Sequence, residues 1–386
     1  MDLPLFRFIE PDVGVYLYYA GRDRKYMRIS QAESAIFLDL PGLATDPDTF
    51  STEGTMTRAL NRADATKRYL RDPTSNPRPL ATTSYSENVP EVDGRLNQSF
   101  IADLSNLRTM FVDMKVGDVV IMTPSNHYDP LLIGEVKTRW NDNEVLHLPE
   151  QGENAVPYRS VNWLSHSLSR RDFPVQVARR LQNRKAITRI DETYYESIFR
   201  FLYHAYVWGN ISKLDIFGPQ YNSNDPTATA EASFIVKYAI AYYSAFAKGE
   251  VDLFNDLSLE DAADAYFDPE IALQVAQAFG SPGGYVAKLI GSGAAIAVAM
   301  VIATTLSSEA NDPAAVHQQV TAQATEVTSG HRFDVGIDLS ALGNSFRAGK
   351  TAEIRVKYGR PARAKLGMTL HGNRAPELSA TQRVVR

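Results

Sequence analysis

The chain has 386 residues, of which 44% are hydrophobic and 22% charged, and this composition excludes a disordered chain and a polytopic membrane protein. It contains no cysteine, which excludes a disulfide framework, a thiolate nucleophile and a zinc-thiolate site. The formal net charge of -5 gives no overall attraction to nucleic acid, so any basic surface must be local.

The start of the chain, MDLPLFRFIEPDVG, lacks the basic segment and the long apolar run of a secretory signal. We therefore expect the N-terminal domain to lie in the cytoplasm. The length is sufficient for two or three domains of ordinary size, each with its own core.

The first half of the sequence predicts short strands interrupted by helices. Alternating apolar residues after Gly14 predict one strand, and a second short apolar run is closed by Pro41 and Gly42. The patterns at 55–72 and 95–114 predict helices, the second with a continuous apolar face.

Two apolar runs follow, at 116–126 and 130–140, separated by a turn rich in Pro and Asn, and we expect them to pair antiparallel. The strand pattern continues from Tyr158, and a helix is predicted near 174–184 with Pro174 in its first turn. Together these elements predict a small β-barrel decorated by helices.

Residues 113 to 173 also carry a spaced set of residues that goes beyond a strand pattern. The set consists of Gly117-Asp118, Ile133-Gly134-Glu135-Val136, Trp140 and Arg159-x-Val161-x-Trp163. It resembles the PUA-like superfamily, in particular its EVE-like and Mrr N-terminal-like branch, and the resemblance extends over residues 1 to 190. Two positions depart from the family pattern, because Trp140 stands where Tyr is usual and Asn162 where a basic residue is usual.

The resemblance implies binding without turnover, since such domains hold a modified base or a nucleotide in a barrel pocket, often as the sensing end of anti-phage or restriction systems. The side chains suited to stack on a flipped base and to bond its edge are Trp140, Tyr158 and Trp163, with Arg159 and Asp118 nearby. The alternative is that Trp163 belongs to the barrel core and that Gly117-Asp118 is only a turn.

A basic stretch follows the proposed barrel strands. Its arginines Arg170, Arg171, Arg179 and Arg180 are candidate contacts to phosphate groups, and Arg184, Lys185 and Arg189 continue the run. The alternative is a helix face that is simply solvated. No catalytic, cofactor-binding or metal-binding motif stands out, so the sequence predicts a binding protein without cofactor or metal.

The second half of the chain is predicted to be helical over residues 191–284. It then contains a stretch of twenty uncharged residues, 289–308, which is about the length needed to cross a hydrocarbon core of roughly 30 Å. Gly291, Ala295, Ala299 and Ala303 recur at every fourth position, which predicts a face suited to close helix packing and self-association. The helix 285–308 is therefore either a membrane span, which would anchor the chain in the inner membrane, or a helix buried in a cytoplasmic protein.

The tail, residues 309–386, is predicted to form three short strands. From Arg332 onward it carries eleven Lys or Arg against four Asp or Glu, so it is basic within an acidic chain. This charge belongs either to the surface of a small β-domain or to a region that contacts nucleic acid or anionic lipid.

Taken together, the sequence predicts an α+β multidomain chain with a PUA-like sensing domain at 1–190. Ligand in the barrel would control a membrane-inserting or oligomerising C-terminal part, in a homo-oligomer that acts in anti-phage defence. The ligand would be a nucleotide or modified DNA or RNA. The rival hypothesis is a soluble nucleic-acid-binding specificity component of a restriction-like system, with the apolar helix in its dimer interface.

Overall fold

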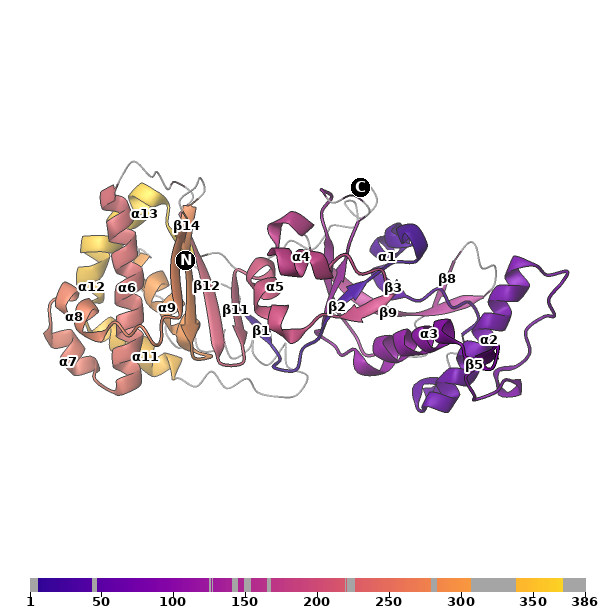
Figure 1. The fold of residues 1–386 in the computed structure, drawn as a ribbon. Helices are drawn as coiled ribbons and strands as arrows, with labels where there is room; N and C mark the ends of the chain where they lie inside the picture. Colours follow the sequence, from indigo (N-terminus) through magenta and orange to yellow (C-terminus); the bar gives the residue numbers. More distant parts are fainter. Residues whose placement is uncertain are drawn as a thin grey trace. The chain divides into compact units, whose positions relative to one another are not determined.

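The computed structural model describes residues 6–43, 47–124, 126, 128–140, 145–148, 154–164, 168–218, 220, 226–278, 283–306 and 338–370. The described residues fall into two compact units (Figure 1). Asp12–Phe201 forms the N-terminal unit. The residues up to Pro11 join Leu202 and the residues that follow it in the C-terminal unit.

The N-terminal unit is built on a mixed sheet in which β2 and β6 are parallel and the other neighbours antiparallel. Its strands are β2 (Val15–Tyr18), β3 (Ala35–Phe37), β6 (Val119–Met122), β7 (Leu132–Val136), β8 (Val145–His147), β9 (Ala155–Leu164) and β10 (Ile187–Arg189). They follow the order β10-β2-β6-β7-β9-β3, with β8 also paired to β9. The antiparallel pairing predicted for the two apolar runs is confirmed by the β6–β7 register, in which Val120 faces Gly134. No pairing among the described strands joins β10 to β3, so the described sheet is open.

Helices and single turns surround this sheet. The α-helices are α1 (Met27–Ala32), α2 (Glu53–Arg71), α3 (Gln98–Arg108), α4 (Val175–Arg180) and α5 (Tyr195–Leu202). The shorter turns are η1 (Arg22–Arg24), η2 (Pro47–Phe50), η3 (Thr82–Ser84), η4 (Thr109–Asp113), η6 (Arg170–Asp172) and η7 (Glu192–Tyr194). The apolar side chains of α2 and α3 complete the core of this unit, among them Leu60 and Leu107, which are fully buried.

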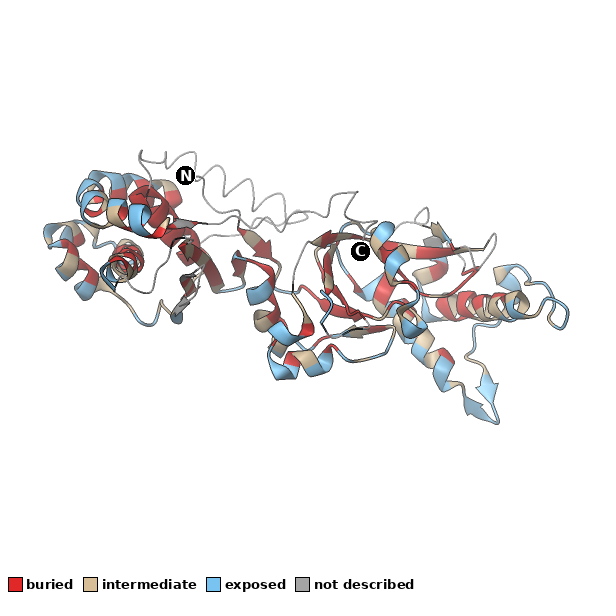
Figure 2. Cartoon of the chain, turned by 90° about the horizontal axis from the view of Figure 1, so that it is seen from above, coloured by how far each residue is buried: buried red, intermediate tan, exposed pale blue. Residues whose placement is uncertain are grey.

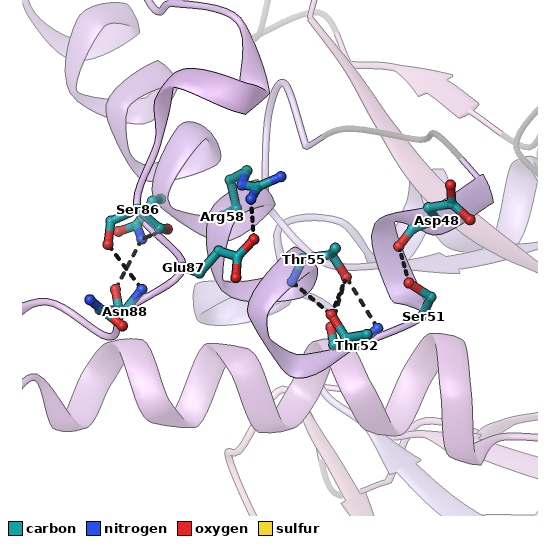
Figure 3. Close-up of polar contacts among 9 residues, drawn as sticks. Asp48, Ser51, Thr52, Thr55, Arg58, Ser86, Glu87 and Asn88 are labelled. Atoms are coloured by element: carbon teal, nitrogen blue, oxygen red, sulfur yellow. Dashed lines mark hydrogen bonds and ion pairs between the residues drawn. The ribbon is translucent and has the colours of Figure 1, made fainter.

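The first turn of α2 is held by side chains that are themselves local in sequence. Thr52 accepts the backbone N–H of Thr55, and the Thr55 hydroxyl accepts the backbone N–H of Thr52, which satisfies two donors that a helix start leaves open (Figure 3). One turn later Arg58 forms an ion pair with Glu87, which ties the following loop to the helix. Beyond that loop the hairpin of β4 (Glu91–Val92) and β5 (Arg95–Leu96) is exposed on both strands (Figure 2).

The C-terminal unit is a second mixed sheet covered by helices. Its strands are β1 (Arg7–Ile9), β11 (Ala205–Trp208), β12 (Ile211–Gly218), β13 (Gln274–Ala278), β14 (Gly283–Ile290) and β15 (Thr369–Leu370), in the order β1-β11-β12-β14-β13 with β15 on β12. Its helices are α6 (Pro226–Lys248), α7 (Val251–Asp256), α8 (Leu259–Tyr266), α9 (Ala294–Leu306), α11 (Leu339–Ala348), α12 (Thr351–Ile354), η8 (Arg355–Gly359) and α13 (Arg360–Leu366).

Helix α9 is the centre of this unit. All thirteen of its residues are buried, and it packs against α6, β12, β14, β15 and the helices from α11 to α13 (Figure 1). The Ser212 hydroxyl on β12 accepts the N–H of Ala295 and donates to the carbonyl of Gly291, so it fixes the start of the helix. At the other end Arg355 and Arg363 donate to the carbonyls of Thr304 and Leu306, which lack partners within the helix.

The apolar stretch is a helix buried in the C-terminal unit. The predicted fold class, which contained one long apolar helix over 285–308 after a wholly helical region, is wrong. Residues 283–290 form strand β14, so the helix has thirteen residues and is about 20 Å long at 1.5 Å per residue. Among the described residues, none of the helices combines the length and the hydropathy needed to span a bilayer. Of the four residues predicted to form a packing face, Gly291 lies in the turn before α9, and Ala295, Ala299 and Ala303 are fully buried within one copy of the chain, so the three alanines offer no accessible face to a second copy.

The wholly helical region predicted for 191–284 is also wrong. Helix α5 ends at Leu202, and Ala205–Gly218 forms the β11–β12 hairpin around Gly209, whose φ of 55° places it in the left-handed region. Strand β13 (Gln274–Ala278) and the first residues of β14 also lie within this range. The hairpin signal is the alternation of ISKLDIF after a Gly-Asn turn, which outweighs the helical pattern of the aromatics before it.

The strand-rich tail predicted for residues 309–386 is also wrong over its described part. Residues 339–366 are almost continuously helical, and of the predicted strands only the short β15 is found. The segment AEIRVKYG alternates in polarity, but Val356 is 57% exposed, whereas Ile354, Ala362 and Leu366 are buried. Those buried positions recur at multiples of four residues, which is the period of a helix face. The first predicted strand of the tail, 332–340, lies outside the described residues up to position 337, and its last two residues begin α11.

We predict that Gly359→Ala destabilises the C-terminal unit. A Cβ at Gly359 would lie 2.3 Å from the carbonyl oxygen of Thr305, which is backbone in the last turn of α9 and cannot rotate away. Overpacking of this kind costs about 1 to 3 kcal/mol, and urea unfolding measures it. The control is Ala364→Ser on the exposed side of α13, which should change the free energy of unfolding by less than about 0.5 kcal/mol. Equal stability of Gly359→Ala and the parent chain would contradict this packing.

Candidate functional site

Three of the five predicted ligand residues hold the N-terminal unit together. Arg159 is 2% exposed, and its guanidinium donates to the carbonyls of Met110, Met114 and Thr138 at 3.0 to 3.1 Å. Trp163 is 4% exposed, and its indole N–H donates to the carbonyl of Ser30 at 2.9 Å. These bonds tie β9 to the loops around it, and they leave neither side chain facing an opening.

Asp118 is buried at the start of β6 and binds backbone. Its carboxylate accepts the N–H of Gly14 at 2.6 Å and the N–H of Lys115 at 2.7 Å, so it joins β2 to the turn that precedes β6. Burial raises the pKa of Asp118 to about 6, and the two hydrogen bonds offset that rise only in part.

The remaining two aromatics are partly buried. Trp140 meets Phe50 and Phe111 edge to face, with ring centroids 4.6 and 5.6 Å apart, while Phe50 and Phe111 stack directly on each other. Its indole nitrogen is buried, with no hydrogen-bond partner among the described residues. Tyr158 packs against the same core. The five predicted residues therefore do not converge on one open pocket in the described structure.

Asp118 generates a prediction on pH. Its pKa is higher in the folded than in the unfolded chain, so its contribution to stability is complete below about pH 4 and is lost as the pH rises through about 6. The difference is on the order of 3 kcal/mol. In Asp118→Asn one backbone N–H faces an NH2 group, so the variant should have a lower free energy of unfolding than the parent chain. Because asparagine does not titrate, the difference in free energy of unfolding between the two proteins should be larger at pH 4.5 than at pH 7. Urea unfolding at both pH values measures the gap, and a gap independent of pH would contradict the assignment.

Most of the arginines that were predicted to contact phosphate lie on the surface, unlike the predicted ligand residues. Arg171, Arg179 and Arg180 are exposed, whereas Arg170 is 5% exposed. Arg171 lies over the ring of Tyr128 at 3.8 Å and Arg180 over the ring of Tyr194 at 5.9 Å. None of the four forms an ion pair with a carboxylate in the part of the chain that the structure describes.

A pocket of about 580 Å³ lies beside this basic stretch, at the β10 end of the sheet. The end of α4 supplies Arg180, the next turn supplies Asn183, β10 supplies Thr188 and Arg189, and α5 begins with Tyr195; Asp191 and Glu192 complete the polar rim. The volume is within the range of pockets that bind small molecules. The pocket belongs entirely to the N-terminal unit.

Some polar groups of this pocket form hydrogen bonds within the chain, and others have no such partner among the described residues. The Arg189 guanidinium donates to the Tyr195 hydroxyl, which also accepts the N–H of Val15 and so fixes Arg189 to the sheet. The Thr188 hydroxyl is buried and has no hydrogen-bond partner among the described residues, which is unusual for a buried polar atom. The Asp191 carboxylate accepts the N–H and the hydroxyl of Thr193, and these bonds lower its pKa, so it stays ionised.

The arrangement suits a ligand with both anionic groups and hydroxyl or amide donors. Arg180 and Arg189 line it without a close ion pair to a described carboxylate, and Asp191 and Glu192 place carboxylates on the same rim. Among the described residues, no group of three or more His, Asp or Glu side chains is placed to hold a metal ion. The charged and polar side chains of the rim support binding through charge and hydrogen bonds.

Sequence inspection identified the arginines of this region and missed the pocket. Thr188, Asn183 and Tyr195 carry no sequence signal of their own, because their roles depend on β10 pairing with β2. The one usable signal was the density of basic residues between Arg170 and Arg189. The chain as a whole matches no protein-family model, no curated protein and no solved structure.

Proposed function

We propose that the N-terminal unit binds a nucleotide or a single-stranded nucleic acid, with its phosphate groups against Arg180 and Arg189 in the β10 pocket. The single observation that carries this proposal is a pocket of about 580 Å³ lined by two arginines, neither of which forms a close ion pair with a described carboxylate, although Asp191 lies near enough to Arg180 to be stabilised by its charge. Arginine binds phosphate well because its planar donors match two oxygens at once.

The surroundings of the pocket support the same ligand class. Arg179, Arg184 and Lys185 are exposed on α4 and on the turn after it, so a chain of phosphates leaving the pocket would meet further positive charge. The ring of Tyr194 lies 5.9 Å from the Arg180 guanidinium, and an aromatic ring beside a basic site can stack on a base without sequence preference. The resemblance of residues 113–173 to PUA-like domains points to the same class of ligand.

The proposal includes a regulatory part that rests on the resemblance alone. Binding in the N-terminal unit would change the self-association of the chain, as in a sensor joined to an effector in anti-phage defence. Sedimentation velocity with and without ligand tests this part separately from binding itself.

We predict that Arg180→Gln weakens binding of a fluorescently labelled oligo(dT). Each lost phosphate contact should lower the slope of log K against log salt by about 0.7 for a single strand, so the difference between the proteins should be largest at low salt. Fluorescence anisotropy over a series of salt concentrations measures both affinity and slope.

The matched control is Arg71→Gln, which removes an exposed arginine from the end of α2 in the same unit. It leaves the pocket intact and changes the net charge equally. If both variants lose the same affinity, the binding is unspecific attraction to positive charge and the pocket has no special role. If the parent chain binds neither oligo(dT) nor a labelled nucleotide, the proposed function is wrong.

A further inference from the structure

A second group of arginines lies at the carboxyl ends of the parallel strands β2 and β6, and none of its members lines the β10 pocket. Arg24 donates through Nε to the carbonyl of Thr123 at 2.7 Å, and Arg170 donates to the carbonyl of Pro124 at 3.2 Å. Thr123 and Pro124 are consecutive and directly follow β6. Two guanidinium groups are thus held on neighbouring carbonyls.

No carboxylate compensates this positive charge among the described residues. The acids in the same loops are committed elsewhere: Asp172 accepts the N–H and the hydroxyl of Ser169, Asp129 accepts from Asn126, and Asp23 lies beside Arg22. Like charges repel more strongly where water is partly excluded, so an arrangement of this kind favours an anion between or beside them.

Arg170 is the more deeply buried of the two guanidinium groups. It is 5% exposed, and its Nε has no hydrogen-bond partner among the described residues. Burial and the charge of Arg24 lower the pKa of Arg170, which is the direction expected of a cation without a counterion. Buried donors are normally satisfied, and an oxyanion oxygen would satisfy this one.

The backbone that carries Arg24 is constrained to place it there. Asp23 and Arg24 have φ values of 56° and 58°, in the left-handed region that residues with a Cβ rarely adopt. The Arg24 guanidinium also lies over the ring of Tyr19, 5.0 Å from its centroid. Conformations of this kind persist where the surrounding contacts fix them, and they are concentrated at functional sites.

Arg171 adds a third cation at the rim. Its guanidinium stacks 3.8 Å from the ring centroid of Tyr128, which is 64% exposed and follows Pro124 by four residues. An exposed ring with a guanidinium on it is a surface on which a base can stack.

We infer that Arg24, Arg170 and Arg171 form a site for a phosphate group at the carboxyl ends of β2 and β6. Arg24 and Arg170 contact the phosphate oxygens, and Arg171 holds the adjacent group beside Tyr128. As a second attachment point for a nucleic acid, the site rests on the proposed function, while its affinity for phosphate is independent of the β10 pocket.

The test uses the full chain and the variant Arg24→Asn. Asparagine tolerates the left-handed conformation better than most residues, so the loop should fold while the guanidinium is lost. Inorganic phosphate should raise the thermal unfolding temperature of the parent chain relative to chloride at equal ionic strength. Arg24→Asn should lose that rise, the exposed variant Arg171→Gln should reduce it, and Arg71→Gln should keep it.

The phosphate group could belong to a nucleic acid or to a small molecule, and binding of labelled oligo(dT) distinguishes these two sources. If Arg24→Asn binds the oligonucleotide more weakly than Arg71→Gln does, the ligand is a phosphodiester of a nucleic acid, whether or not inorganic phosphate alone gives a shift. If oligonucleotide binding is unchanged and only the response to inorganic phosphate is lost, the ligand is a free phosphate or a small phosphorylated molecule.

Two results overturn the inference. One is a parent chain whose unfolding temperature is the same in phosphate and chloride, together with equal oligonucleotide binding by the parent chain and Arg24→Asn. The other is an equal loss in Arg24→Asn and Arg71→Gln. Failure of the proposed function is a separate outcome, because Arg180→Gln would then bind like the parent chain while Arg24→Asn still lost its response to phosphate.

Discussion

A helix without a polar face must be covered on every side, and this constraint organises the C-terminal unit. Helix α9 contains no charged residue and is fully buried, so elements from distant parts of the sequence must meet around it. The sheet covers it through β12 and β14, α6 packs against it, and the helices from α11 to α13 close the remaining side. Burying one large aliphatic side chain contributes about 1.5 to 3 kcal/mol, so its Ile, Val, Met and Leu residues account for a substantial part of the stability of the unit.

The small residues of α9 allow close packing, as the sequence suggested, but they pack against elements of the same chain and not against a second copy. Alanine at every fourth position lets neighbouring backbones approach closely in a membrane or in a soluble core alike. What decides between the two is whether the rest of the chain can surround the helix. That depends on strands β11 to β14, whose alternating pattern lies in a region dominated by helical and aromatic residues. If β11 to β14 are predicted to be helices, the sheet that covers one side of α9 is absent from the prediction, and too little chain then remains to bury the apolar stretch.

Local signals predicted the N-terminal unit better. Strand β2, the β6–β7 pair, and helices α2 and α3 follow directly from alternation and helical spacing. The candidate site was harder, because residue type alone does not distinguish Arg159 from Arg171. Both stand in the same part of the sequence, yet one bonds three backbone carbonyls in the core and the other stacks on an exposed ring. Alternation along β9 gives the relevant clue, since Arg159, Val161 and Trp163 share one buried face.

The buried and the exposed arginines also differ in what they can do for an anion. The donors of Arg159 are used by carbonyls that the fold fixes, so it stabilises the unit and has little left to offer a ligand. Arg24, Arg170 and Arg189 each use only part of their donors in the hydrogen bonds described above, and Arg180 is exposed. The chain is acidic overall, but charges beyond about 8 Å are largely screened at physiological salt. Attraction of an anion therefore depends on these local guanidinium groups, and the net charge of -5 disfavours anions that cannot reach them.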